Sequence, residues 1–288
     1  MIRHKQYDRL DPQIVVQKLT EFFLEDNIQE DLTTLLTQSE NKFVQAVFLA
    51  KEDLYFSGKE IILQSFLDCQ IIRIENDGEF IAKGQSIAVL QGPIQTLLSK
   101  ERVVLNLLQR MSGITSQTKA LTHITAPYNI QLLDTRKTTP GLRMFEKFAV
   151  CMGGGTNHRY SLKDAIMIKD NHLIGFDTEN DVLDVANKLR SVYPDIDLEI
   201  EVDTKSQLNL ALESGATSIL LDNFSPEKLK EIIPYVRSHL KGNNKYIELS
   251  GGIIAETLSN YCIEGVDGIS MGCLTHKIQS KDISLDIK

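Results

Sequence analysis

The feature that most constrains the fold is an alternation that begins at residue 130. Six short apolar runs each end in polar or glycine residues, and segments with helical periodicity separate most of them. Strands that alternate with helices are typical of βαβ units and a parallel sheet. Apolar residues along the whole strand are typical of burial on both faces. The pattern predicts a shortened six-stranded α/β barrel, TIM-like with parallel strands; an open doubly wound sheet is the alternative. The six runs are IQLLDTRK, DAIMIKDN, LEIEVD, SILLDN, YIELSGG and DGISMG.

The chain has a different character before residue 95, where a mixed α+β region is predicted. DPQIVVQKLTEFFLEDN reads as an amphipathic helix, and KFVQAVFLAK and CQIIRIEND read as strands on either side of the helical KEIILQSFLD. Two short strands follow in NDGEFIAKGQSIAVLQG, and residues 96–121 have the pattern of a long helix. A chain of 288 residues is long enough for one large domain or two ordinary ones.

Composition excludes some classes of partner. The net charge of −8 and the pI of about 5.3 argue against a general nucleic-acid binder, because phosphate backbones attract basic surfaces. No apolar run approaches the ~20 residues that span a bilayer. The start, MIRHKQYDRLD, lacks the apolar core of a signal peptide. We therefore expect a cytoplasmic protein with no nucleic-acid or membrane partner.

Positive charge is concentrated in one segment of this acidic chain. Residues 135–169 contain seven Lys or Arg and two acids, a net of +5. Cations that follow parallel strands gather at the active face of a barrel, where they repel one another unless an anion binds. Arg suits carboxylate and phosphate because its planar fork donates two parallel hydrogen bonds. The pattern predicts a site for a multiply anionic small molecule; exposed charges, or ion pairs with barrel acids, are the alternative. The cations concerned are Arg136, Lys137, His158, Arg159 and Lys169.

Acids and glycines end the later strands. Glu201 and Asp222 could bind Mg²⁺ and sugar hydroxyls through carboxylate oxygens, or could pair with the same cations. Ser250, Gly251 and Gly252 precede a predicted helix start, and Gly272 ends the last run. Two neighbouring glycine loops at this end of a barrel favour a phosphate site, and tight βα turns are the alternative.

Three further features stay open. His172 and His276 could act as an acid or base, and we favour a structural role for both. The glycines of residues 153–155 could cradle an anion or allow a tight loop.

With these residues assembled, the chain resembles the quinolinate phosphoribosyltransferases. The N-terminal LEDNIQEDLTT is also similar to the family, with Glu30 where a Gly is usual. The resemblance covers most of residues 95–285 and implies an N-terminal α/β sandwich, residues 1–112, followed by the barrel, residues 113–288, whose C-terminal tail could pack back on the first domain. The matching segments are ERVVLNLLQRMSGI, DTRKTTPGLRMFEKFAV, GGGTNHRYSLKDAIMIKDNH, EIEVD, LLDNF, LSGG and MGCLTH.

The resemblance implies a reaction and a role for each matched residue. The activity would transfer the phosphoribosyl group of phosphoribosyl pyrophosphate to quinolinate with loss of CO₂, giving nicotinate mononucleotide for NAD synthesis. The chain would work as a homodimer or a multiple of one, with Arg102 reaching the neighbouring subunit's pocket. Glu201 and Asp222 would hold the ribose and Mg²⁺, and Ser250, Gly251, Gly252 and Gly272 would lie near the 5′-phosphate. The residues that would line the quinolinate pocket are Arg136, Lys137, His158, Arg159 and Lys169.

Rival functions remain at this point. A paralogous phosphoribosyltransferase could use another acid, such as nicotinate, without decarboxylation, although a second carboxylate needs the full set of cations. A Schiff-base aldolase could use Lys169 at its strand end. A non-enzymatic sensor would bind the same anions without releasing pyrophosphate. Lys137, Lys169, Glu201 and Asp222 are the residues that we expect to act in catalysis.

Overall fold

The computed structural model describes the chain except residues 1–3, 40–41, 175–178, 240–241 and 243. The chain divides into two compact units. The barrel unit comprises Met1–Gln6, Leu121–Thr138 and Gly155–Cys273. The sheet unit comprises Tyr7–Ala120, Thr139–Gly154 and Leu274–Lys288. The division of the chain into domains at residues 112 and 113 stays a prediction.

The barrel unit contains a sheet of six parallel strands, in the order β6-β11-β10-β9-β8-β7. All six predicted runs are strands, which confirms the predicted barrel-type fold. Most of their residues are buried and none is exposed, as expected for strands covered on both faces. The six are β6 (Gln131–Leu133), β7 (Ile166–Ile168), β8 (Leu198–Val202), β9 (Ser218–Asp222), β10 (Tyr246–Ser250) and β11 (Gly268–Ser270).

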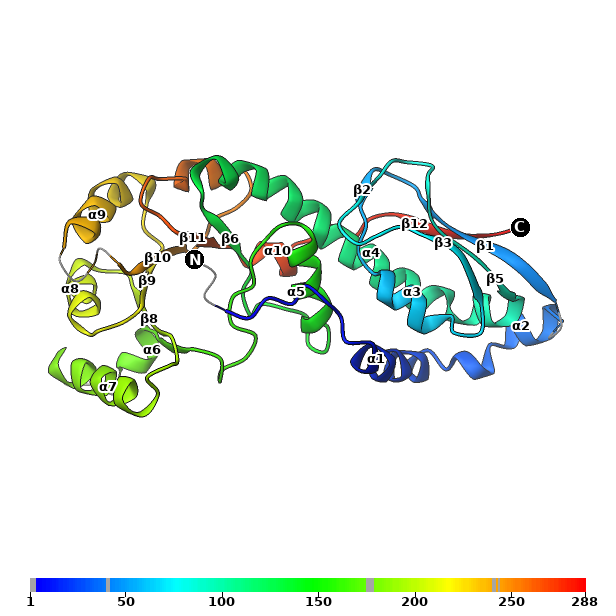
Figure 1. The fold of residues 1–288 in the computed structure, drawn as a ribbon, viewed down its shortest axis with the longest axis horizontal. Coiled ribbons are helices and arrows are strands. Elements are labelled where there is room, and N and C mark those ends of the chain that lie inside the picture. Colours follow the sequence, from blue (N-terminus) through cyan, green and yellow to red (C-terminus); the bar gives the residue numbers. More distant parts are fainter. Residues whose placement is uncertain (1–3, 40–41, 175–178, 240–241, 243) are drawn as a thin grey trace. The chain divides into compact units, whose positions relative to one another are not determined.

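Helices connect these strands and lie beside the sheet (Figure 1). The Thr204 hydroxyl caps α8 and Gln207 completes a capping box, whereas Ser225 caps α9 with Pro226 in its first turn. Leu198 of β8 and Ala211 of α8 are both fully buried, and these two elements contact each other. The helices of this unit are η2 (Ala126–Tyr128), α6 (Asp170–Leu173), α7 (Glu179–Val192), α8 (Lys205–Glu213), α9 (Pro226–Ser238) and η3 (Leu258–Tyr261).

One helix prediction in this unit was wrong. The segment AETLSNYCIE, which follows the predicted helix start, contains only the short 3₁₀ helix η3, and no helix begins directly after Gly252. The buried side chains here are Ile253, Leu258 and Cys262. The first two are five residues apart, which does not repeat on one face of an α-helix. The predicted phosphate site at this loop therefore has no helix N-terminus that could contribute to binding.

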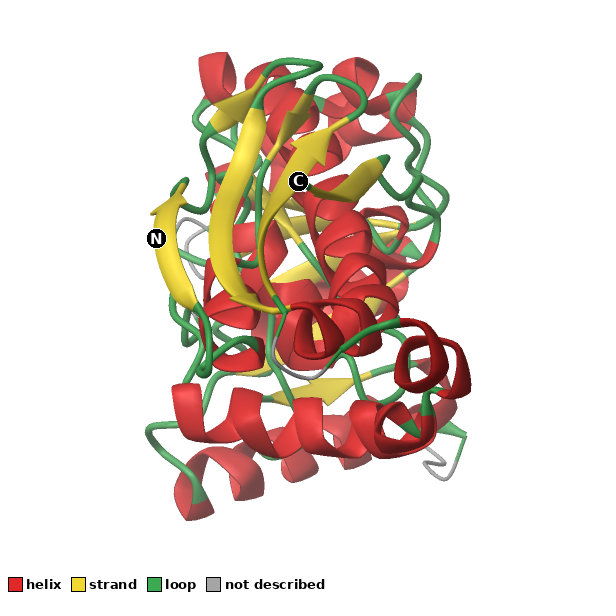
Figure 2. Ribbon diagram, turned by 90° about the vertical axis from the view of Figure 1, so that its right-hand side faces the viewer, coloured by secondary structure: helices red, strands yellow, loops and turns green. Residues whose placement is uncertain are grey.

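The sheet unit contains a four-stranded antiparallel sheet in the order β12-β1-β5-β3, and its strands run side by side in Figure 2. The C-terminal strand β12 pairs with β1, with Phe48 opposite Leu285. A second pair, β2 with β4, is also antiparallel. The strands are β1 (Phe43–Ala50), β2 (Leu54–Tyr55), β3 (Gln70–Ile74), β4 (Phe80–Ile81), β5 (Ser86–Pro93) and β12 (Ile283–Ile287).

Helices complete the sheet unit as an α/β sandwich, as the resemblance implied. Apolar side chains of α3 and β1, among them Ile61, Ile62 and Phe48, are buried together with Phe66. Across the described residues, no helix has both the length and the apolar character that a membrane span requires. The helices are α1 (Pro12–Glu25), η1 (Ile28–Glu30), α2 (Leu32–Thr37), α3 (Lys59–Ser65), α4 (Ile94–Thr125), α5 (Arg143–Met152) and α10 (Cys273–His276).

Candidate active site

The carboxyl ends of the six parallel strands carry the residues that the sequence singled out. Leu133 pairs in parallel with Thr156, so the segment leading to His158 and Arg159 runs beside β6. Eleven of the twelve predicted site residues belong to the barrel unit. The twelfth, Arg102, is exposed on α4 of the sheet unit. The roles of all twelve stay predictions.

Two arginines converge at the start of this edge. Arg159 is only 8% exposed, and one of its terminal nitrogens donates to the Ala165 carbonyl at 2.8 Å. Burial, and then the charge of Arg136, lower the pKa of Arg159. The Nε of Arg136 is buried, and among the described residues no group accepts a hydrogen bond from it. A buried guanidinium donor beside a second guanidinium is an arrangement that a bound anion would stabilise.

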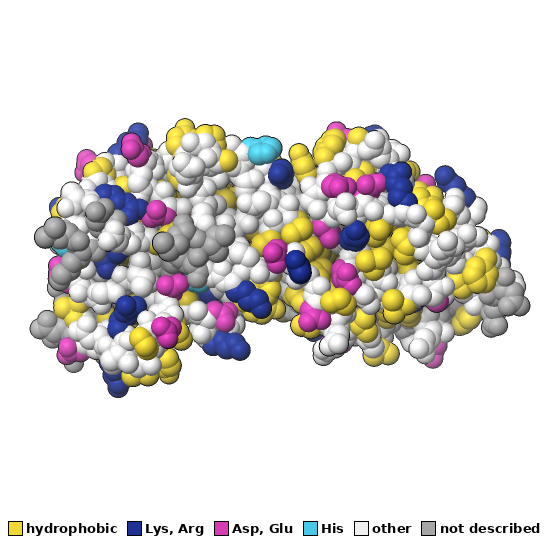
Figure 3. Space-filling view, viewed as in Figure 1, with side chains coloured by type: hydrophobic (Ala, Val, Ile, Leu, Met, Phe, Trp, Pro, Cys, Tyr) yellow, Lys and Arg dark blue, Asp and Glu magenta, His cyan; other side chains and the backbone are white. Residues whose placement is uncertain are grey.

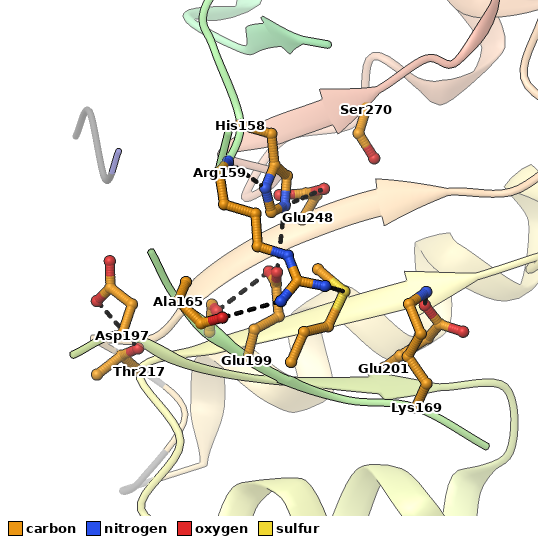
Figure 4. A network of polar contacts seen from close by, with 12 residues as sticks. His158, Arg159, Ala165, Lys169, Asp197, Glu199, Glu201, Thr217, Glu248 and Ser270 are labelled. Carbon is orange, nitrogen blue, oxygen red and sulfur yellow. Dashed lines mark hydrogen bonds and ion pairs between the residues drawn. The ribbon is translucent and has the colours of Figure 1, made fainter. Parts of the chain in front are cut away.

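One of the predicted cations forms an ion pair with a barrel acid, which was the alternative to an anion site. The ammonium of Lys169 forms an ion pair with Oε2 of Glu201, between the ends of β7 and β8. Figure 4 shows this pair apart from the histidine cluster. Asp222, half-buried at the end of β9, accepts a hydrogen bond from the side-chain amide of Asn223 at 2.6 Å. Lys137 is exposed, and its backbone N–H donates to the Thr135 hydroxyl at 3.0 Å.

The Ser250–Gly252 loop lies directly against the end of β9. The backbone N–H of Asn223 donates to the Ser250 carbonyl at 3.0 Å. Gly251 has φ +90°, and a Cβ there would lie 2.3 Å from Oδ1 of Asn223. Gly252 also has a positive φ, +62°, but open space surrounds its missing side chain. Gly251 is therefore required by both backbone conformation and close approach, and Gly252 by conformation alone.

His158 is buried beneath this edge rather than exposed at it. Its Nε2 lies 3.3 Å from an oxygen of Glu199 and 3.5 Å from an oxygen of Glu248 (Figure 4). Its Nδ1 accepts a hydrogen bond from the Arg159 backbone N–H at 2.7 Å. The ring of His4 stacks on it with centroids 4.6 Å apart. The histidine is thus held on several sides inside the unit.

Two family models together match most of the chain. The model of the quinolinate phosphoribosyl transferase C-terminal domain matches residues 114–286, and the model of the N-terminal domain matches residues 31–112. The chain belongs to the quinolinate phosphoribosyltransferase family.

Individual family members support the same assignment. A probable nicotinate-nucleotide pyrophosphorylase [carboxylating] of Bacillus subtilis is 42% identical over 274 residues, which cover 93% of this chain and 92% of that protein. The nicotinate-nucleotide pyrophosphorylase [carboxylating] of Mycobacterium leprae is 33% identical, covering 89% and 91%. The solved nicotinate-nucleotide pyrophosphorylase of Francisella tularensis matches 99% of this chain and all of its own, with a TM-score of 0.90 and 30% identity. Human nicotinic acid phosphoribosyltransferase, at 12% identity and a TM-score of 0.57, covering 94% of this chain and 73% of its own, shows a likeness of fold alone.

Three buried carboxylates of the barrel unit, Asp134, Glu199 and Glu248, were not among the predicted site residues. Asp134 is fully buried and accepts from the Asn157 side chain at 2.7 Å and from the His158 backbone N–H at 2.8 Å. Glu199 and Glu248 lie inside otherwise apolar strands. A buried carboxylate within such a strand is itself a signal, because it is costly to bury without partners.

Two of the open features have structural contacts. Nδ1 of His172 accepts from the Lys169 backbone N–H at 2.9 Å, so this histidine caps α6. In the sheet unit, a Cβ on Gly153 would lie 2.7 Å from the Thr115 carbonyl. That glycine therefore permits close packing of α5 against α4.

The turn after the two predicted cations is also anchored within the sheet unit. Both carboxylate oxygens of Glu146 lie within hydrogen-bond reach of the Thr139 backbone N–H, at 3.2 and 3.4 Å. Glu146 is buried and is held by Arg110, whose Nε donates to it at 2.8 Å. Arg110 also donates to the Thr139 hydroxyl at 2.9 Å. This contact explains how an exposed Thr-Pro-Gly turn keeps a fixed start.

Proposed function

We propose that this chain transfers the phosphoribosyl group of phosphoribosyl pyrophosphate to the ring nitrogen of quinolinate and releases CO₂, forming nicotinate mononucleotide and pyrophosphate. Membership of the family supports the reaction. The observation that carries it in this chain is the buried Arg159 guanidinium beside Arg136, a half-buried residue whose Nε is buried. Quinolinate has two carboxylates, and each guanidinium can bind one of them in a bidentate manner.

The acceptor site includes cations beyond this pair. Lys137 and Lys169 contribute ammonium groups. His158 holds the Arg159 backbone, because its Nδ1 accepts a hydrogen bond from the Arg159 backbone N–H. Lys169 begins paired with Glu201, so its charge is balanced before substrate enters. A carboxylate of quinolinate can take over part of that ion pair. Nicotinate has one carboxylate fewer and leaves one cation without an anion.

The donor site is formed by the later strands. Ser250, Gly251, Gly252 and Gly272 contact the 5′-phosphate, with backbone amides freed by the glycines. The carboxylates of Glu201 and Asp222, at adjacent strand ends, bind the ribose hydroxyls. Two carboxylates and substrate phosphates are also the ligands that Mg²⁺ prefers, so the donor set fits that ion. When bound, Mg²⁺ neutralises charge on the leaving pyrophosphate.

The chain's own residues account for the remaining chemistry. As the bond from the anomeric carbon to pyrophosphate weakens, the ribose develops positive charge, which the Glu201 and Asp222 carboxylates stabilise. The quinolinate nitrogen then forms its bond to that carbon. In the resulting mononucleotide the positive ring accepts the electron pair left by the departing CO₂. Lys137 or Lys169 stabilises the carbanion until a proton replaces the lost carboxylate.

The active form is a homodimer or a multiple of one. Arg102 is a charged, exposed residue on a helix whose other faces are largely buried, and it reaches the neighbouring subunit's acceptor site. Large apolar side chains are exposed on the sheet unit, and Figure 3 shows yellow patches among the charges there. Exposed apolar surface of this kind is typical of subunit contacts. Examples are Ile14, Leu24, Leu32, Leu35, Leu36 and Phe43.

Release of CO₂ tests the reaction. The protein is incubated with phosphoribosyl pyrophosphate, Mg²⁺ and quinolinate labelled in the carboxylate next to nitrogen, and both labelled CO₂ and nicotinate mononucleotide are followed. We expect the two products in equal amounts, and neither without phosphoribosyl pyrophosphate. Binding of both substrates with no pyrophosphate released would instead support the anion sensor. Borohydride trapping of a carbonyl substrate on Lys169 would support the aldolase.

A further inference from the structure

A buried polar cluster lies one layer beneath the proposed site. It consists of His158, Glu199 and Glu248, whose nearest polar atoms all lie within 4.8 Å of one another. The two glutamates are each two residues before a predicted site residue on the same strand, Glu201 on β8 and Ser250 on β10. Side chains two apart point to the same face of a strand. The cluster is therefore the next interior layer of the barrel, and Figure 4 shows its three side chains around that of Arg159.

The hydrogen bonds determine which nitrogen of His158 carries the proton. Nδ1 accepts from the Arg159 backbone N–H at 2.7 Å, so it has no proton of its own. The proton of a neutral imidazole is then on Nε2, which faces oxygens of Glu199 at 3.3 Å and Glu248 at 3.5 Å. A metal ion on Nε2 would require both ring nitrogens to be deprotonated. The geometry therefore favours a shared proton over a metal.

We propose that Glu199 and Glu248 are positioning residues: as carboxylates within ion-pair distance of Nε2 they fix the ring of His158, and through its Nδ1 they fix the Arg159 backbone and the direction of that guanidinium. The proposal rests on the proposed function for its consequence, which is the binding of quinolinate. Neither glutamate contacts a substrate in this role, because both act through His158.

Several further contacts hold the glutamate, the histidine and the arginine in place. Ser218 on β9 donates to the other oxygen of Glu199 at 3.1 Å, which orients that carboxylate. Asp134 accepts from the His158 backbone N–H at 2.8 Å, and His4 stacks on the ring. The Arg159 side chain is itself fastened at its far end to the Ala165 carbonyl. Arg159 is thus held at both its backbone and its guanidinium. A rotation of the His158 ring would break the backbone contact and displace the guanidinium.

The test compares two variants of one residue, Glu248→Gln and Glu248→Leu. Glutamine keeps an oxygen that can accept from Nε2–H, whereas leucine of similar size does not. We expect Glu248→Leu to raise the KM for quinolinate about 10-fold, as loss of an outer-shell partner does elsewhere. The KM for phosphoribosyl pyrophosphate should stay within about threefold, and Glu248→Gln should restore most of the loss. Glu264→Gln, which removes an exposed acid, is the control.

A second measurement does not depend on turnover. In protein labelled with ¹⁵N-histidine, with His158 assigned from a His158→Gln variant, we expect a pyridine-like shift at Nδ1 and a pyrrole-like shift at Nε2. The opposite tautomer, or a stoichiometric metal found by elemental analysis and lost in Glu248→Leu, would overturn the proposal. So would equal increases of both KM values, or no rescue by glutamine in a folded variant. If quinolinate is not turned over but the expected tautomer is seen, the proposed function fails and the histidine geometry stands.

Discussion

The guanidinium of Arg159 is buried beside a second guanidinium, that of Arg136, and its pKa is lowered first by burial and then by this neighbouring charge. A lowered pKa in a base means that the protein disfavours its charged form. The charge is retained all the same, because the ordinary pKa of Arg is far above neutral pH. The unliganded protein therefore carries an electrostatic cost at this point, which we expect a doubly negative ligand to reduce.

Substitution of either arginine tests this relationship. We expect Arg136→Ala and Arg159→Ala each to weaken quinolinate binding by about 2–5 kcal/mol, because each leaves one ligand carboxylate without its buried partner. Titration calorimetry with quinolinate measures the loss. Lys163→Ala removes an exposed cation from the same segment and should bind normally. Wild-type affinity in both arginine variants would refute the assignment.

Much of the fold could be predicted because the barrel strands are apolar along their length. SILLD and YIELS are buried at nearly every position, so the pattern in the sequence and the burial in the structure coincide. The helix prediction for the segment after Gly252 was wrong, because scattered apolar residues there suggested a helical period. Its actual backbone begins with two left-handed glycines and reaches only a 3₁₀ turn.

The site was less predictable than the fold. Positive charge at strand ends pointed to Arg136 and Arg159, since parallel strands bring their carboxyl ends to one edge. The spacing of residues could not indicate that Lys169 pairs with Glu201, because an ion pair across two strands depends on register. It also gave no reason to connect His158 with Glu248, which is ninety residues further along the chain. Those contacts exist only once the strands are side by side.

The two neighbouring glycines of the phosphate loop should respond differently to alanine. Gly251→Ala should lower the free energy of unfolding by about 1–3 kcal/mol, because φ is +90° and the new Cβ would meet Asn223. Gly252→Ala should lower the free energy of unfolding by only about 1 kcal/mol. Its new Cβ would meet no atom within 4 Å, so the cost is only that of an alanine in a left-handed conformation. Urea denaturation of both variants measures the difference. Equal losses, or a larger loss at Gly252, would contradict this account of the loop.

A buried carboxylate in the sheet unit predicts a pH effect on stability. Oδ1 of Asp77 accepts from the backbone N–H groups of Gly58 and Lys59 at 2.5 and 3.0 Å. Burial nevertheless raises the pKa of Asp77, with these hydrogen bonds opposing the rise. A carboxyl whose pKa is higher in the folded state contributes stability below its unfolded pKa and loses it as pH rises through the folded pKa.

Asp77→Asn keeps the accepting oxygen and removes the charge. The variant should match the wild type in acid, and above the folded pKa of Asp77 it should become the more stable of the two. Unfolding free energies between about pH 3 and pH 8, a range that begins below the unfolded pKa of an aspartate, provide the comparison. Asp8→Asn removes an exposed charge and serves as the control. A variant that loses stability relative to wild type as pH rises would show the opposite sign and refute the argument.

Mixing of subunits tests the proposed role of Arg102. Arg102→Ala and Lys137→Ala should each be inactive alone, since one lacks the residue given to the partner and the other lacks a residue of its own site. After denaturation and refolding together, some heterodimers should contain one intact site and recover up to about a quarter of wild-type activity, from random pairing. Refolded Lys137→Ala mixed with itself is the control. No recovery in a mixture shown to contain heterodimers would exclude a shared site.

The central claim is that the guanidiniums of Arg136 and Arg159 converge on a doubly negative acid. Its most direct test is the affinity of the wild-type protein for quinolinate compared with nicotinate. Both acids share the pyridine ring and one carboxylate, so calorimetry at matched pH and salt isolates the second carboxylate. The account predicts that quinolinate binds at least tenfold more tightly, about 1.4 kcal/mol. Equal affinity for the two acids, or tighter binding of nicotinate, would contradict it.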